Sequence, residues 1–341
     1  MKMKQAFRML LGAGLAACAQ AADLDFPIPL TVREPAGLAR SDEPVTTGVP
    51  FAPGRLQPGD SLSLRAGGAA VPLQTRTLAL WPDGSVKWVL LDFQASLAPK
   101  GVLDLELDKG KAARLPRGIR VKESSRTLTV DTGPLQVTLN RRGFDLFSSV
   151  RIDGKEALAK PAAALEITAL DGKKRDSMKD LAKDFELKVM EEGPVRTVVR
   201  AIGEIQATKE HRLGFTCWYH FYAGRKFVRA FFTMRNLAGQ TITHTDQKNT
   251  PDASFQKWLS GKPGNVTVSA VDLIVPTKRA GSFVIGGDRP HAGEPGTAPA
   301  KLYQDSSASW PWQAGDGKVF DLRLRANIEW MKQNAPDGRT R

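Results

Sequence analysis

The residues best suited to chemistry lie close together between Phe215 and Asn236. Turn residues from Ala223 to Lys226 separate two runs that are rich in aromatic side chains, which predicts a β-hairpin. If Tyr222 pairs with Phe227, one face of the hairpin carries apolar side chains typical of a core. The other face interleaves aromatic rings with histidine and arginine, and it holds Trp218, His220, Tyr222, Phe227, Arg229, Phe231, Thr233 and Arg235.

This second face has the side chains that an acidic sugar would require. Aromatic rings stack on the apolar faces of sugars, and arginine is a bidentate partner for a carboxylate. Elimination from a uronate also needs its carboxylate neutralised and a base that removes the neighbouring proton. We therefore expect a catalytic set and a substrate-binding set, with packing of the face against another domain as the alternative. The catalytic set is His220, Tyr222, Arg229 and Arg235, and the substrate-binding set is Trp218, Phe231 and Arg225.

The elements that must position this face are β-strands. Short runs of alternating polar and apolar residues, separated by Gly, Pro and Asp turns, are typical of a barrel or a sandwich. These runs cover residues 61–64, 75–80, 102–107, 127–130, 135–139, 165–170 and 195–205, and only residues 177–184 indicate a helix. The pair Glu191-Glu192 beside a Gly-Pro turn indicates a solvated strand end rather than a glycoside hydrolase pair.

Two further segments carry a recognisable signature. Trp81-Pro82-Asp83-Gly84-Ser85-Val86-Lys87-Trp88 predicts a turn followed by a strand that is apolar on both faces up to Phe93. Gly48-Val49-Pro50-Phe51-Ala52-Pro53-Gly54 precedes it by about thirty residues. With segments 27–34 and 71–76, their order resembles the N-terminal RIFT-type β-barrel of the exo-rhamnogalacturonan lyase (YetA-like) family over residues 27 to 107.

The resemblance implies a fold and a function. In that family a β-sandwich and a large α/α toroid follow the barrel, and the better-known members cleave the rhamnogalacturonan backbone of pectin by β-elimination. We expect an all-β chain, with a RIFT-type barrel at 23–110, an antiparallel β-sandwich at 111–325, a tail at 326–341 and no room for the toroid. The function implied is the N-terminal portion of a secreted polysaccharide lyase. The alternative is a non-catalytic carbohydrate-binding or cell-envelope scaffold protein.

The N-terminus predicts export. Lys2, Lys4 and Arg8 precede a short apolar stretch at 9–17, so residues 1–22 read as a secretory signal peptide that is too short to span a membrane. Ala19-Gln20-Ala21 suits ordinary signal peptidase, whereas Leu15-Ala16-Ala17-Cys18 fits a lipobox in which Cys18 is acylated. Both routes lead to the periplasm or the cell surface. Cys217 alternates with Tyr219 and Phe221, which predicts a buried structural thiol.

The net charge of the chain indicates which class of partner it binds. The formal net charge is +13, and three of the cations lie in the expected leader. Such an excess favours a polyanion, and outside the cell we expect an acidic polysaccharide of the pectin type. No nucleic-acid motif occurs, and neither a cofactor nor a calcium loop is expected. The alternative is that the scattered cations serve solubility.

Overall fold

The computed structural model describes residues 26–159, 164–169, 171–181, 185–208, 211–237, 268–275, 283–285, 291–293, 312–313 and 319–320. The secondary structure of these residues is strands, turns and bends, which confirms the all-β prediction. None of them belongs to a helix long and apolar enough to cross a membrane. The expected leader with Cys18 and the tail at 326–341 lie outside the described residues.

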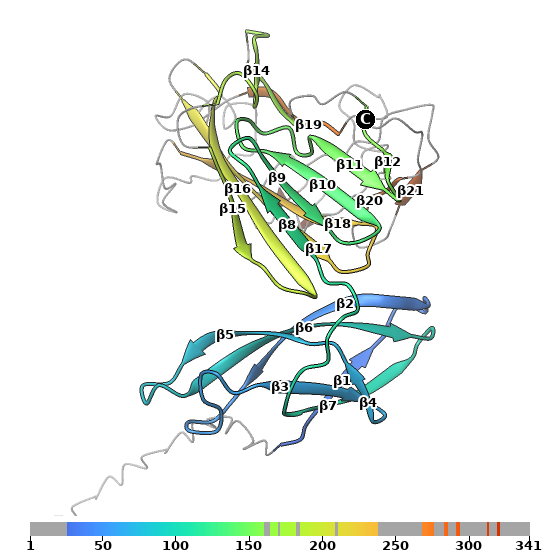
Figure 1. The fold of residues 1–341 in the computed structure, drawn as a ribbon. Helices are drawn as coiled ribbons and strands as arrows, with labels where there is room; N and C mark the ends of the chain where they lie inside the picture. Colours follow the sequence, from blue (N-terminus) through green and yellow to red (C-terminus); the bar gives the residue numbers. More distant parts are fainter. Residues whose placement is uncertain are drawn as a thin grey trace, which may run out of the picture. The chain divides into compact units, whose positions relative to one another are not determined.

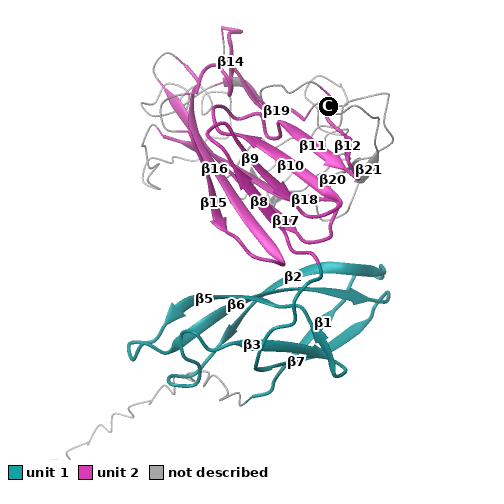
Figure 2. Ribbon diagram, viewed as in Figure 1, with its two compact units in different colours: residues 1–116 teal, residues 117–341 magenta. Residues whose placement is uncertain are grey.

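The chain divides into two compact units between Pro116 and Arg117 (Figure 2). The sequence placed the boundary a few residues earlier, after residue 110. The first unit contains two antiparallel sheets. One has the order β1 (Ile28–Arg33), β7 (Val102–Lys109), β3 (Leu62–Ala66) and β4 (Ala69–Val71), and the other has the order β2 (Arg40–Pro50), β6 (Val86–Leu97) and β5 (Gln74–Leu80).

One apolar core joins the two sheets of the first unit. Alternate residues of β6, namely Val89, Leu91 and Phe93, are at most 3% exposed and belong to the same cluster as Leu105 and Leu107 of β7. The prediction that β6 is buried on both faces is wrong at Trp88, which is 38% exposed on the opposite face. Its ring lies over Gly48 of β2, where an added Cβ would sit 3.4 Å from a ring carbon.

The two signature segments of the first unit are bonded to each other. Trp81 Nε1 donates to the carbonyl of Phe51 at 2.8 Å, and the Ser85 hydroxyl accepts the Gly54 N–H at 2.8 Å. The predicted turn is confirmed, because the N–H of Gly84 reaches the Trp81 carbonyl at 2.9 Å. Gly84 has a φ of +84°, which glycine adopts without strain.

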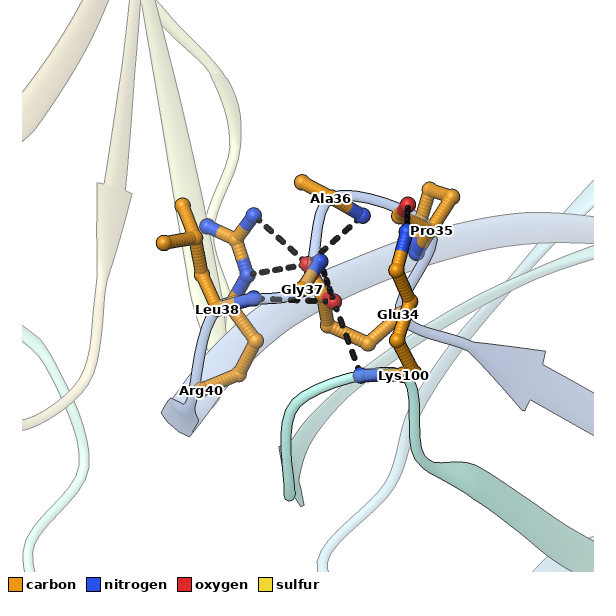
Figure 3. A network of polar contacts seen from close by, with 7 residues as sticks. All are labelled: Glu34, Pro35, Ala36, Gly37, Leu38, Arg40 and Lys100. Atoms are coloured by element: carbon orange, nitrogen blue, oxygen red, sulfur yellow. Dashed lines mark hydrogen bonds and ion pairs between the residues drawn. The ribbon is translucent and has the colours of Figure 1, made fainter.

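A buried carboxylate fastens the loop after β1 (Figure 3). The side chain of Glu34 is 2% exposed, and its oxygens accept the N–H groups of Gly37 at 2.6 Å, Leu38 at 3.1 Å and Lys100 at 3.3 Å. The Arg40 guanidinium lies 3.0 Å away. Desolvation alone would raise the pKa of Glu34, but these donors outweigh it and lower the pKa to about 2.

The described part of the second unit contains strands in several sheets (Figure 1). A five-stranded sheet has the order β12 (Lys155–Glu156), β11 (Ser149–Ile152), β10 (Leu135–Asn140), β9 (Thr127–Asp131) and β8 (Arg120–Glu123). A four-stranded sheet has the order β15 (Glu186–Glu191), β16 (Arg196–Gln206), β17 (Arg212–Tyr222) and β18 (Val228–Asn236). A third has the order β14 (Lys174–Asp176), β13 (Leu165–Ala169) and β19 (Val268–Leu273). Two short pairs are β20 (Phe283–Ile285) with β21 (His291–Gly293), and β22 (Trp312–Gln313) with β23 (Val319–Phe320).

Aromatic side chains fill the core of the second unit. The ring of Phe144 lies 4.6 Å from that of Phe215 and 5.9 Å from that of Phe232, measured between centroids. Tyr219 is 1% exposed, and its hydroxyl donates to the Leu146 carbonyl at 3.0 Å. Cys217 is buried as predicted, and burial raises the pKa of its thiol to about 12. The inward-facing side chains of β17 are therefore buried in the core.

The helix predicted at 177–184 is wrong over residues 177–181, which form turns and an isolated bridge; residues 182–184 lie outside the described part. The Asp176 carboxylate accepts the N–H groups of Met178 and Lys179 at 2.9 Å each, so it caps the start of one tight turn. Leu181 then pairs with Ile205, which takes the chain back to the sheet. This pairing with a distant strand overrides the local helical signal and accounts for the missing helix.

We predict that Glu34→Gln destabilises the first unit at neutral pH. The glutamine amide carries no charge to pair with Arg40, and its NH2 group would face backbone N–H groups, which are donors as well. The folded pKa of about 2 lies below the ordinary 4.5, so this stabilisation is complete above pH 4.5 and is lost as the pH falls toward 2. Urea unfolding midpoints should thus differ clearly between wild type and variant at pH 7, and the difference should shrink to a small fraction of that value as the pH falls to about 2. Glu106→Gln, at an exposed position of β7, is the control. An equal gap at both pH values would contradict the prediction.

We also predict that Gly203→Ala destabilises the second unit by about 1–3 kcal/mol, the usual cost of overpacking a core. Gly203 faces Phe215 across β16 and β17, and an added Cβ would lie 2.8 Å from the end of that ring. The measurement is chemical unfolding of the single variant, of Phe215→Leu and of the double variant. The double variant should lose less stability than the two single losses together, and strict additivity would exclude the proposed clash.

Candidate functional site

The hairpin predicted to carry chemistry exists, with the predicted register. Strands β17 and β18 are antiparallel and pair Trp218 with Phe231, Tyr219 with Ala230 and His220 with Arg229. Gly224 adopts a φ of +69° in the connecting turn. The apolar side chains of β17 point into the core described above, so the other side chains form a separate surface. We call this surface the aromatic-basic face, and it consists of Trp218, His220, Tyr222, Phe227, Arg229, Phe231, Thr233 and Arg235.

Near the turn, arginines lie against aromatic rings. The guanidinium carbon of Arg229 is 5.4 Å from the ring centroid of Tyr222 and 5.8 Å from that of Phe227. Arg225 lies 5.6 Å from the Phe227 ring. Such cation–π contacts hold a flexible cation over an apolar surface. The structure thus brings Tyr222, Phe227 and Arg229 of the face together with Arg225 of the turn in one cluster.

The middle of the face combines a histidine with an exposed ring. Phe231 is 56% exposed, and the centroid of its ring lies 5.3 Å from that of His220 at an interplanar angle of 79°. Burial lowers the pKa of His220 first, and the charge of Arg196 and then of Arg229 adds to this, while Glu191 opposes it. An imidazole of this kind favours the neutral form at pH 7.

Two residues that the sequence analysis did not place in the site, Glu191 and Arg196, support His220. Arg196 Nη2 donates to Glu191 Oε2 at 2.8 Å, with side chains only 7% and 9% exposed, and Arg196 Nη1 lies 3.4 Å from His220 Nδ1. The interpretation of Glu191 as a solvated strand end is therefore wrong, although Glu192 is exposed. The cause is a register shift between Val189 and Glu191, which places Glu191 opposite Val198. Val198 is in turn the partner of His220.

The predicted residues do not all meet. Trp218 lies 5.8 Å from the guanidinium carbon of Arg200, which pairs with Glu186 at 3.1 Å. Arg235 is six residues beyond Arg229 on β18, opposite Gly214. At about 3.4 Å per residue this separates the two arginines by roughly 20 Å along the strand. Arg235 and Arg229 therefore cannot hold the same carboxylate.

Comparison with known proteins places this hairpin within a described domain. The PcRGLX-like N-terminal RIFT barrel domain matches residues 34–106, and the PcRGLX-like protein central beta sandwich domain matches residues 119–240. Over 191 residues the chain is 29% identical to the "Uncharacterized protein YetA" of Bacillus subtilis (strain 168). The aligned region covers 53% of this chain and 22% of that relative. The expected order of barrel and sandwich is confirmed. The chain therefore belongs to the PcRGLX-like family, the exo-rhamnogalacturonan lyase (YetA-like) family that the Trp81 to Phe93 signature indicated.

Proposed function

We propose that the chain is the N-terminal portion of a secreted polysaccharide lyase that acts on rhamnogalacturonan or a related uronate-containing glycan by β-elimination. Membership of the family supports the reaction class. The observation that carries a role for this chain is the aromatic-basic face, where the exposed Phe231 ring lies beside His220 and the ring-bound Arg229.

Each group of the face has a task in such a reaction. Phe231 and Trp218 stack on sugar rings, and Arg229 with Arg225 binds a uronate carboxylate. A neutralised carboxylate makes the neighbouring proton more acidic, and a base then removes it. His220 and Tyr222 are the candidate bases. Arg235 lies too far along β18 for the same carboxylate, and we assign it to another sugar of the polymer.

A second function is a non-catalytic carbohydrate-binding protein, and one observation favours it. Tyr222 is only 4% exposed, and Nδ1 of His220 lies against Arg196. The Tyr222 side chain and Nδ1 of His220 are therefore closed to a substrate proton in this arrangement. The two functions share the same glycan-binding face and differ in whether the chain performs elimination itself.

The proposed partner and location follow from charge and from the N-terminus. A formal charge of +13 supports attraction to a pectin-type polyanion. Residues 1–22 support export to the periplasm or the cell surface, with a lipid anchor on Cys18 as one of the two processing routes.

We predict that Arg229→Ala lowers the rate of elimination about 100-fold, because removal of one preorganised donor typically costs that much. Rhamnogalacturonan is incubated with the purified chain, and the ultraviolet absorbance of the unsaturated uronate product is followed. Arg229→Lys should recover little, since lysine lacks the planar bidentate group. Arg151→Ala, an exposed arginine of β11, is the control. Without any rise in absorbance, retention of wild type on immobilised pectin supports the binding function, and absence of retention contradicts both.

We further predict that Phe231→Ala weakens retention on immobilised acidic pectin about fivefold, because one aromatic contact contributes about 1 kcal/mol. Phe231 is 56% exposed, so the fold should tolerate the loss of its ring. Leu273→Ala in β19 removes an apolar side chain of 46% exposure away from the face and should leave retention unchanged. Equal losses in the two variants would exclude a specific role for Phe231.

A further inference from the structure

The Glu191–Arg196–His220 contacts form a chain that runs across three strands. Glu191 ends β15, Arg196 begins β16 and His220 lies in β17, two residue pairs along from the pair that Arg196 forms with Tyr222. The carboxylate holds one terminal nitrogen of Arg196 at 2.8 Å, which directs the other toward His220 Nδ1 at 3.4 Å. Both charged side chains are more than nine-tenths buried. A buried ion pair keeps one geometry better than an exposed pair does.

The chemistry of arginine decides which ring nitrogen of His220 carries the proton. A guanidinium has donors and no acceptor. The nitrogen that faces Arg196 must therefore be the unprotonated one, so a neutral ring carries its proton on Nε2. We propose that Glu191 and Arg196 are positioning residues that fix His220 as the neutral Nε2–H tautomer, so that it donates a hydrogen bond to an acidic sugar instead of removing a proton.

The charges around the ring agree with this assignment. Arg196 and Glu191 face His220 from β16 and β15, and Arg229 faces it from β18, with the Phe231 ring at its edge. A protonated His220 ring would place a third positive charge between Arg196 and Arg229. Its Nδ1–H would also point at the N–H of Arg196, so that two donors would face each other. Burial acts in the same direction, and the pKa of His220 lies below 6.5. The neutral donor is thus the stable form at neutral pH.

The ligand class follows from this donor, and this step rests on the proposed function. His220 and Arg229 are cross-strand partners on the same face, so the imidazole and the guanidinium extend from neighbouring positions of the sheet. A uronate carboxylate can accept from both. The His220 donor would then select for the carboxylate, and the base for elimination must come from another group.

The tautomer is testable without any ligand. The chain is labelled with nitrogen-15 in its histidine rings, and long-range proton–nitrogen correlations are recorded at pH 7. There are four histidines, and the signals missing in His220→Gln identify His220. The expected pattern is a protonated Nε2 and an unprotonated Nδ1. A proton on Nδ1, or a doubly protonated ring, would overturn the proposal.

A charge-neutral double variant tests the role of the pair. Glu191→Gln with Arg196→Met removes both charges together and so leaves no buried ion without its partner. We expect the Nδ1–H tautomer to become visible and the pKa of His220 to move up toward 6.5, because Arg196 lowers it more than Glu191 raises it. The matched control is Glu186→Gln with Arg200→Met, the other ion pair between β15 and β16. The same spectral change in both double variants, or none in the first, would contradict a positioning role.

The donor role is tested by retention on immobilised acidic pectin. A glutamine amide can place an N–H near the position of Nε2, so His220→Gln should bind within about twofold of wild type. His220→Ala should bind about tenfold more weakly, the loss expected for one hydrogen bond to a charged group. Equal weakening in both variants would overturn the donor role. If wild type is not retained, the proposed function fails, while the tautomer measured in the ligand-free chain is judged separately.

Discussion

The alternation of side chains along β17 is the constraint on which the aromatic-basic face depends. Phe215, Cys217, Tyr219 and Phe221 are at most 1% exposed and belong to the core of the second unit. A slip of one residue would send all of them to the other surface, so burial fixes the register. Close packing strengthens this control, because Gly203 leaves room for the Phe215 ring and the Tyr219 hydroxyl reaches the Leu146 carbonyl. Trp218 and His220 face outward as a consequence.

This constraint explains why sequence alone could predict the hairpin so well. The turn at Ala223 to Lys226 is local, and the two-residue period carries the pairing from the turn through Trp218 and Phe231. The signature turn at Trp81 to Ser85 was predictable for the same reason, since Asp83, Gly84 and Ser85 bond within a few residues. Family resemblance added the order of the two domains, which periodicity cannot supply.

The supports of these elements were not predictable, because each depends on an irregular backbone or a distant partner. The shift between Val189 and Glu191 turns Glu191 toward Arg196, whereas a regular strand would place it on the other face. Glu34 reads as an ordinary polar residue until Lys100, 66 residues later, brings its N–H to the carboxylate. The predicted helix stops after the turn that Asp176 caps, because Leu181 pairs with the distant Ile205.

The contacts within the aromatic-basic face order its polar side chains before a ligand binds. An exposed arginine loses rotamer freedom when it binds a ligand, at a cost of about 0.5–1.5 kcal/mol for each immobilised side chain. Arg229 already lies against Tyr222 and Phe227, so part of this cost is met on folding. Arg196 similarly restricts His220 before any ligand arrives. Tyr222 and Phe227 therefore hold the arginine, and in the function that we propose, stacking on a sugar beside the two donors falls to the exposed Phe231, with Trp218 further along β17.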